Sequence, residues 1–177
     1  MNLPTLSQLS AARRVFVIGA TGTIGQATVR ALLRQGHHVV CFVRPRAGVG
    51  GKLSAADSAK LFPGAEVRVG NVADAASLAR DGFCGERFDV LVSCLASRTG
   101  TPKDAWAIDH HAHILALTAA KAAGVTQVVL LSAICVQKPL LAFQQAKLAF
   151  EKALIESGLT YSIVRATAFF KDRKSVV

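Results

Sequence analysis

Residues 14–25 read Arg14-Val15-Phe16-Val17-Ile18-Gly19-Ala20-Thr21-Gly22-Thr23-Ile24-Gly25. The apolar run that ends at Ile18 is typical of a strand buried on both faces of a parallel sheet. Three glycines follow, with two residues between each pair. Apolar positions then recur at helical spacing as far as Gln35, and Gly36 is suited to end a helix. The stretch therefore predicts a buried strand, a tight glycine turn and a helix.

The spacing of the three glycines is typical of a turn that binds a dinucleotide. Gly19 permits the tight turn, Gly22 lets the backbone approach a pyrophosphate, and Gly25 lets the helix pack close to the strand. The free N–H groups at the start of the helix would face the phosphates. A glycine turn without a ligand is the alternative, but the position between a buried strand and a helix favours binding. The residues predicted to contact the dinucleotide here are Gly19, Thr21, Gly22, Thr23, Ile24 and Gly25.

The rest of the chain repeats the alternation of apolar strands and helices. We predict six strands that form a doubly wound parallel sheet, the α/β architecture of the Rossmann fold. This domain is expected to cover residues 13–170, between an N-terminal extension (1–12) and a segment (171–177) that we expect to be a non-native tail. After the first strand, further strands are predicted at 39–43, 65–70, 88–94, 127–132 and 161–165, and helices at 55–60, 74–80, 106–123 and 141–157.

The composition narrows the classes of partner. The 177 residues suit one α/β domain, and 51% hydrophobic against 18% charged residues excludes a disordered chain. A net charge of +10 would suit nucleic acid or another polyanion, but the basic residues are scattered and the chain has one Trp and one Tyr, so we expect no nucleic-acid partner. No apolar run reaches the ~20 residues of a membrane span. We expect a cytoplasmic protein, or a chloroplast one if the source is a plant or alga.

The residue that follows the second strand predicts the choice of cofactor. Sites that prefer NAD place an acidic residue there, where it bonds the ribose 2′-hydroxyl. This chain has Arg44, followed by Arg46, and a guanidinium can bind a 2′-phosphate through two hydrogen bonds. We therefore predict NADPH, with Arg44 as the main discriminator and Lys52 as a weaker candidate. A solvated basic loop is the alternative interpretation.

Two further strand ends are expected to reach the same crevice, because ligands of such sheets bind at the carboxyl ends of the strands. Asn71 and Val72 follow the third strand and are predicted to meet the adenine. Cys94 and Ala96 follow the fourth strand and are predicted to lie where the ribose and nicotinamide pass.

The catalytic pattern of short-chain dehydrogenases is incomplete. Those enzymes use Ser with Tyr-x-x-x-Lys, in which the Lys lowers the pKa of the phenol that exchanges the proton. Ser132 and Lys147 match the Ser and the Lys, but Phe143 stands in the Tyr position and has no proton to give. This argues against carbonyl reduction and sugar epimerisation, and is compatible with hydride delivery to a conjugated C=C bond. Lys147 would hold the nicotinamide ribose or supply the proton through water; a surface lysine is the alternative.

The segment Ser132-Ala133-Ile134-Cys135-Val136-Gln137-Lys138-Pro139-Leu140-Leu141, followed by Phe143 to Lys147, resembles the divinyl chlorophyllide 8-vinyl-reductases, which are atypical short-chain dehydrogenases. The similarity extends over residues 13–170. It implies NADPH-dependent reduction of the 8-vinyl group of a tetrapyrrole pigment, divinyl chlorophyllide or protochlorophyllide. Lys138 would face the pigment's carboxylate, and Phe143 would lie at the substrate.

The resemblance also implies a smaller C-terminal substrate domain, which we expect to be missing from this chain. We therefore expect cofactor binding with weak or absent turnover. Two other functions stay open: an NADP-binding redox sensor or assembly factor without turnover, and a reductase of another conjugated enone.

For the other histidines, acidic residues, tryptophan and cysteines that could carry chemistry, we favour structural roles. His110 and His113 share a helix face but lack acidic or cysteine partners, so no metal site is expected and both are predicted to be solvated. Asp104 is predicted near a helix N-terminus. Trp106 would contact a flat ligand or pack in the core. The four cysteines show no paired spacing and predict no disulfide framework.

Overall fold

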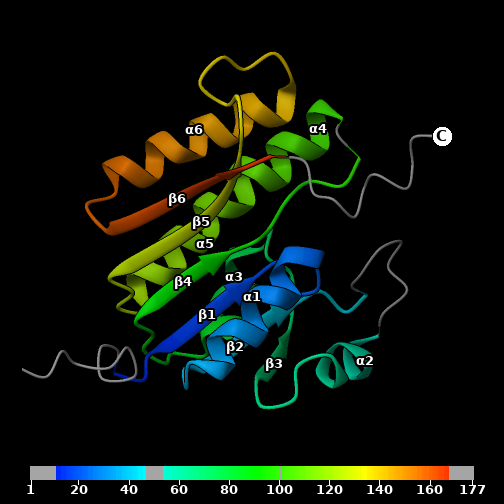
Figure 1. Cartoon of the computed structure of the whole chain (residues 1–177), viewed down its shortest axis with the longest axis vertical. Helices are drawn as coiled ribbons and strands as arrows, with labels where there is room; N and C mark the ends of the chain where they lie inside the picture. Colours follow the sequence, from blue (N-terminus) through cyan, green and yellow to red (C-terminus); the bar gives the residue numbers. More distant parts are fainter. Residues whose placement is uncertain (1–10, 47–53, 100, 168–177) are drawn as a thin grey trace, which may run out of the picture.

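The computed structural model describes residues 11–46, 54–99 and 101–167. They form one sheet of six strands in the order β3-β2-β1-β4-β5-β6, in which every neighbouring pair is parallel (Figure 1). The prediction of a doubly wound parallel sheet is confirmed. The strands are β1 (Arg14–Ile18), β2 (His38–Val43), β3 (Glu66–Val69), β4 (Val90–Ser93), β5 (Gln127–Ala133) and β6 (Thr160–Ala166).

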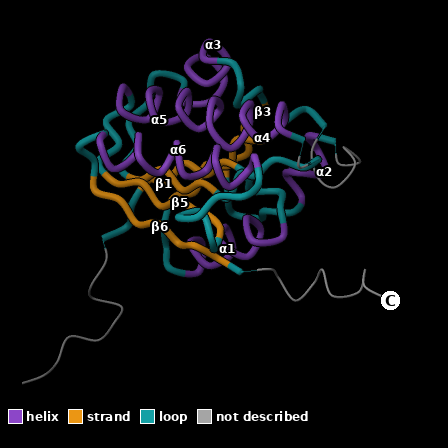
Figure 2. The backbone as a smooth tube through the Cα atoms, turned by 90° about the horizontal axis from the view of Figure 1, so that it is seen from above, coloured by secondary structure: helices purple, strands orange, loops and turns teal. Residues whose placement is uncertain are grey.

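Helices cover the sheet on both sides. Figure 2 shows α3, α5 and α6 over one face and α1 under the other. The helices are α1 (Thr23–Arg34), α2 (Ala55–Lys60), α3 (Ala75–Ser77), α4 (Pro102–Ala105), α5 (His113–Ala122) and α6 (Ala142–Glu156), with π-helical segments η3 (Leu78–Phe83) and η4 (Trp106–Ala112). Among these described helices, none combines the length and the apolar character that a membrane crossing requires.

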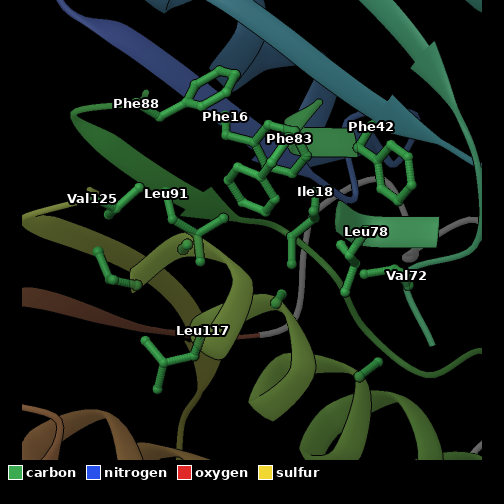
Figure 3. Close-up of a cluster of buried hydrophobic side chains, with 14 of the residues drawn as sticks. Phe16, Ile18, Phe42, Val72, Leu78, Phe83, Phe88, Leu91, Leu117 and Val125 are labelled. Carbon is green, nitrogen blue, oxygen red and sulfur yellow. The ribbon is translucent and has the colours of Figure 1, made fainter. Parts of the chain in front are cut away.

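The core has two halves because successive side chains of a strand point to opposite faces. Phe16 and Ile18 of β1 pack into the half that lies against η3, α5 and α6. Val15 and Val17 pack into the other half, with Val29 of α1. In the first half the ring of Phe16 stacks on that of Phe83, with centroids 4.1 Å apart (Figure 3). Burial on both faces explains why β1 reads as a continuous apolar run.

The order of the strands determines where a ligand site can form. The chain runs from β1 outward to β2 and β3, then returns to the other side of β1 to form β4, β5 and β6. The connections that leave β1 and β4 therefore diverge, and a crevice opens between them at the carboxyl ends of the strands.

The helix predicted at 106–123 begins earlier and is less regular. It starts at Pro102, where the Thr101 hydroxyl caps the first turn by accepting from the N–H of Asp104. Thr before Pro is a helix start signal that the apolar periodicity alone did not reveal. The π-helical turn η4 then widens the helix before α5. Asp104 lies in the first turn, as predicted.

Candidate functional site

A cavity of about 360 Å³ lies at the carboxyl ends of β1, β2 and β4. Most of the predicted cofactor contacts line it, whereas Ile24, Gly25, Arg46, Asn71 and Lys147 do not. The cavity is lined by Ile18, Gly19, Ala20, Thr21, Gly22, Thr23, Gln26, Phe42, Val43, Arg44, Gly70, Val72, Cys94, Leu95, Ala96 and Arg98.

Each of the three glycines in the turn is suited to its position for a different structural reason. Gly19 has φ +75°, and a Cβ there would lie 2.4 Å from the carbonyl carbon of Cys94. A Cβ on Gly25 would lie 2.2 Å from the carbonyl oxygen of Gly19. At Gly22 the nearest atom would be 3.4 Å away, so protein packing tolerates a side chain there. Gly19 lets the turn lie against the backbone after β4, and Gly25 lets helix α1 lie close to the turn. Gly22 keeps the backbone bare where it faces the cavity, which fits a bound pyrophosphate.

The start of α1 is suited to an anion. Gly22 is the N-cap residue, no side chain caps the helix, and the first turn carries no acidic residue. The N–H groups of that turn and the positive end of the helix dipole therefore remain available to a negatively charged ligand.

Two arginines line the same cavity. Arg44 follows β2, as predicted, and Arg98 belongs to the loop after β4. Partial burial lowers the pKa of Arg44, and the positive charge of Arg98 lowers it further. The loop is fixed because the Asp104 carboxylate accepts from the N–H groups of Arg98 and Thr99, at 2.9 and 2.8 Å. Two guanidiniums in one cavity provide the donors that phosphate oxygens need.

Sequence reasoning missed Arg98. Its signal was its position five residues beyond the end of a strand whose carboxyl end borders the crevice.

A second cavity, of about 490 Å³, adjoins the first. The two share Leu95, Ala96 and Arg98, so the loop after β4 borders both. One elongated ligand could pass along this loop from the glycine turn into the second cavity. The second cavity is lined by Leu95, Ala96, Ser97, Arg98, Thr99, Asp109, Leu131, Ser132, Ala133, Phe143, Lys147, Ala166 and Thr167.

The second cavity brings together the three residues of the incomplete catalytic pattern. Ser132 comes from β5, and Phe143 and Lys147 from α6. Lys147 is only 7% exposed, so its interpretation as a surface lysine is wrong. Its Nζ lies 3.0 Å from Oδ1 of Asp109. Burial of the ammonium is possible because this carboxylate accompanies it.

Asp109 is the second residue that sequence reasoning missed. It lies in η4 and is 1% exposed. Its Oδ1 also accepts from the N–H of Ser97, at 3.2 Å, which ties the loop after β4 to Lys147. Within the described part of the chain, its Oδ2 has no hydrogen-bond partner, and neither has the buried Oγ of Ser132. The feature of the sequence that could have revealed Asp109 is its spacing, which places it on the same helix face as Ala105 and Ala112, both of which are buried.

His113 is buried, so its prediction as a solvated residue was wrong. Because a carbonyl can only accept, Nδ1 donates to the oxygen of Ile108 at 2.8 Å, and Nε2 then accepts from the hydroxyl of Ser93 at 2.7 Å. The Ser93 oxygen accepts in turn from the N–H of Leu95, at 3.3 Å. Burial lowers the pKa of His113 to about 4, so the ring is neutral. The pair fixes the start of the loop that borders both cavities.

Other predicted residues lie outside the two cavities. Lys138 is exposed in the connection between β5 and α6. Trp106 is 43% exposed and contacts the ring of His110 rather than packing in the core. Among the described residues, no group of three potential metal ligands lies together. Lys52, the extension up to residue 10 and the segment 171–177 lie outside the described residues.

The parallel sheet, the glycine turn at its switch point and the bare N-terminus of α1 define a dinucleotide-binding protein with a Rossmann fold. The chain belongs to the NAD(P)H-binding family, whose sequence model matches residues 19–177.

Comparison with known proteins agrees with this class and confirms the resemblance found in the sequence. The chain is 46% identical over 164 residues to the chloroplastic divinyl chlorophyllide a 8-vinyl-reductase of Cucumis sativus, covering 89% of this chain and 39% of the relative. It is 28% identical over 159 residues to photosystem II assembly factor Ycf39 of Synechocystis sp., covering 89% of this chain and 45% of the relative. The chain thus spans less than half the length of these relatives.

Solved structures share the fold. The Bordetella bronchiseptica enzyme WbmG in complex with NAD matches 89% of this chain and 54% of its own, with a TM-score of 0.73 and 22% sequence identity.

Proposed function

We propose that the chain is the NADPH-binding part of a reductase that converts the 8-vinyl group of divinyl chlorophyllide or protochlorophyllide into an ethyl group. The observation that carries the proposal is the second cavity, where Ser132 and a buried Lys147 accompany Phe143 instead of a tyrosine. A site without the phenol suits a conjugated C=C bond, whose extended π-system can take up the charge that develops. The 46% identity to a reductase of this name supports the same substrate class.

The cofactor would lie along the loop after β4. The N-terminus of α1 would hold its pyrophosphate and Arg44 its 2′-phosphate, while Lys147 would hold the nicotinamide ribose. When bound, the reduced dinucleotide would supply a hydride, and a proton delivered through water beside Lys147 would complete the ethyl group. The role of this chain's own residues is to orient that cofactor and to keep one positive charge, that of Lys147, beside the reacting group.

The pigment would lie against the outer part of the second cavity. Leu131, Ala133 and Phe143 line it, and Leu140 and Leu141 are exposed in the adjoining connection between β5 and α6. This apolar surface suits a flat tetrapyrrole. Lys138, exposed in the same connection, would pair with the carboxylate of the pigment.

The direct test is a turnover assay. Because this chain spans only 39% of the length of the cucumber reductase, a version extended to that full length is used. It is incubated with NADPH and divinyl chlorophyllide, and the pigment is analysed by mass spectrometry. The expected product is heavier by two hydrogens and has lost one vinyl group. A Lys147→Met variant is expected to lose most of this activity. Binding of NADPH with no turnover would contradict the reductase, and turnover only of other conjugated enones would reassign its substrate.

Arg44 provides the test of the cofactor. Replacement of Arg44 by Asp should weaken NADPH binding at least about a hundredfold and change NADH binding little, because only NADPH carries the 2′-phosphate. Isothermal titration calorimetry measures both affinities. Arg46→Asp is the matched control, since it makes the same charge change in a residue that does not line the cavity. Equal losses for the two cofactors would contradict the choice of NADPH.

An NADP-binding assembly factor without turnover is the second candidate. It is favoured by the missing hydroxyl at Phe143 and by the likeness to Ycf39. This function predicts that NADPH binds while the Lys147→Met variant leaves every measured turnover at the same background level.

A further inference from the structure

The second cavity contains two buried polar atoms, Oδ2 of Asp109 and Oγ of Ser132, that find no hydrogen-bond partner among the residues the structure describes. The two residues are 1% and 4% exposed and come from different elements, η4 and β5. A buried polar atom that has given up water without gaining a partner destabilises the folded protein. Two such atoms in one cavity indicate that a ligand completes their hydrogen bonds.

The chemistry of the two atoms specifies the group that would fit. A carboxylate oxygen only accepts, so the ligand must donate to Asp109. The Ser132 hydroxyl can donate or accept, and the neighbouring ammonium of Lys147 only donates. A sugar hydroxyl does both, because it donates through its hydrogen and accepts through its oxygen. The environment therefore suits a diol better than an anion, which Asp109 would repel, or an apolar ring.

We propose that Asp109 and Ser132 bind the hydroxyls of the nicotinamide ribose directly, and that Asp109 thus does more than compensate the charge of Lys147. The Oδ1 atom holds Lys147 and the N–H of Ser97, which leaves Oδ2 for the ligand. The proposal rests on the function proposed above, because it needs a dinucleotide that extends from the first cavity into the second.

The test separates the two halves of the cofactor. NADPH and 2′,5′-ADP, which lacks the nicotinamide ribose, are titrated into the wild type, Asp109→Asn and Ser132→Ala. We expect each substitution to weaken NADPH about tenfold and 2′,5′-ADP less than about twofold. Thermal unfolding of the free protein is measured in parallel. Ser132→Ala should not lower the unfolding midpoint, because the hydroxyl that it removes has no partner among the described residues.

Glu151→Gln is the matched control for Asp109→Asn. Glu151 is also 1% exposed and paired with a cation, Arg165 at 2.6 Å, but it lines neither cavity. This variant should lose stability while binding both ligands as the wild type does. Should Asp109→Asn fail to fold, the result for Ser132→Ala decides alone.

Several outcomes would overturn the inference. One is that Asp109→Asn weakens both ligands equally, which is the result of general damage. Another is that Ser132→Ala binds NADPH as tightly as the wild type does. A third is that the wild type binds 2′,5′-ADP as tightly as NADPH, which would leave the cofactor choice intact but remove any contribution of the ribose. A wild type that prefers NADH would contradict the proposed cofactor, and the same contrast between variants would then be measured with NADH and 5′-AMP.

Discussion

His113 shows how one buried side chain couples the site to the stability of the fold. Its ring is 1% exposed, packs against the ring of Phe150 at 4.7 Å, and uses both nitrogens in hydrogen bonds. Burial is the main cause of its low pKa, and the charge of Lys147 adds to it. A protonated ring could no longer accept from Ser93, so the loop after β4 depends on a neutral His113.

The low pKa of His113 predicts a loss of stability in acid. The ring takes up its proton near pH 6.5 in the unfolded chain and only near pH 4 in the folded protein. Between these values the unfolded state binds more protons, so stability falls as the pH is lowered through this window, by up to about 3 kcal/mol. Urea unfolding of the wild type and of His113→Gln, at about pH 7 and about pH 4.5, measures it.

Carboxylates with lowered pKa values, such as those of Glu86 and Asp104, also cost stability in acid, and they do so in both proteins. The difference between the wild type and His113→Gln therefore isolates the contribution of the histidine. We expect the wild type to lose more free energy of unfolding than His113→Gln does. The same loss in both would mean that His113 titrates normally in the folded protein.

At the scale of single residues, the sequence predicts the site residues that follow a strand or belong to a motif, because that position alone determines where they lie in the fold. Arg44, Ser132 and Lys147 were predicted in this way, and each lines one of the two cavities. Asp109 and His113 were missed, because they belong to no motif and their burial depends on which helix face meets the sheet. They lie on the face that also carries the buried Ala112 and Ala116.

The turn between β1 and α1 is the element on which the site depends, and its glycines can be separated by experiment. Gly25→Ala places a Cβ 2.2 Å from the oxygen of Gly19, so it should destabilise the protein by about 1–3 kcal/mol. Gly22→Ala meets its nearest atom at 3.4 Å and should leave stability almost unchanged, while the new methyl group weakens NADPH at least about tenfold. Thermal unfolding and calorimetry measure the two effects. A stable Gly22→Ala variant that binds NADPH normally would place the phosphates elsewhere.

The elements themselves were predictable to within a few residues wherever a strand is buried on both faces or a helix has clear end signals. Helix α2 was expected at 55–60 and is found at Ala55–Lys60, capped by Ser54. The segment 74–80 was expected as one helix, but only Ala75–Ser77 is α-helical, and η3 continues it to Phe83. Asp74 caps that helix, since its side chain accepts from the N–H of Ala76. The sequence signal for the cap is local, whereas the π-helical turn depends on packing against the sheet.

At the scale of the molecule, the strand order makes one site out of distant segments. Glycines near residue 20, an arginine at 44, a loop near 95 and a lysine at 147 share two adjoining cavities because β1 and β4 are neighbours. The general rule that ligands bind at the carboxyl ends of such strands was enough to select most of these residues. It could not show that Arg98 and Asp109 enter the same space, since loop and helix geometry decide that.

The net charge of +10 adds a long-range contribution to binding at this site. NADPH is a polyanion, and Arg44 and Arg98 line the first cavity, where it would bind. Salt shortens the range of this attraction, from about 10 Å at 0.1 M to about 3 Å at 1 M. We expect the NADPH affinity to fall about tenfold between about 50 mM and about 500 mM KCl, and the NADH affinity to fall less, because NADH lacks the charges of the 2′-phosphate. Calorimetry at several salt concentrations gives both slopes, and Arg44→Ala should bring the slope for NADPH close to that for NADH. Parallel slopes in the wild type would mean that the extra charges of NADPH lie outside the field of these arginines.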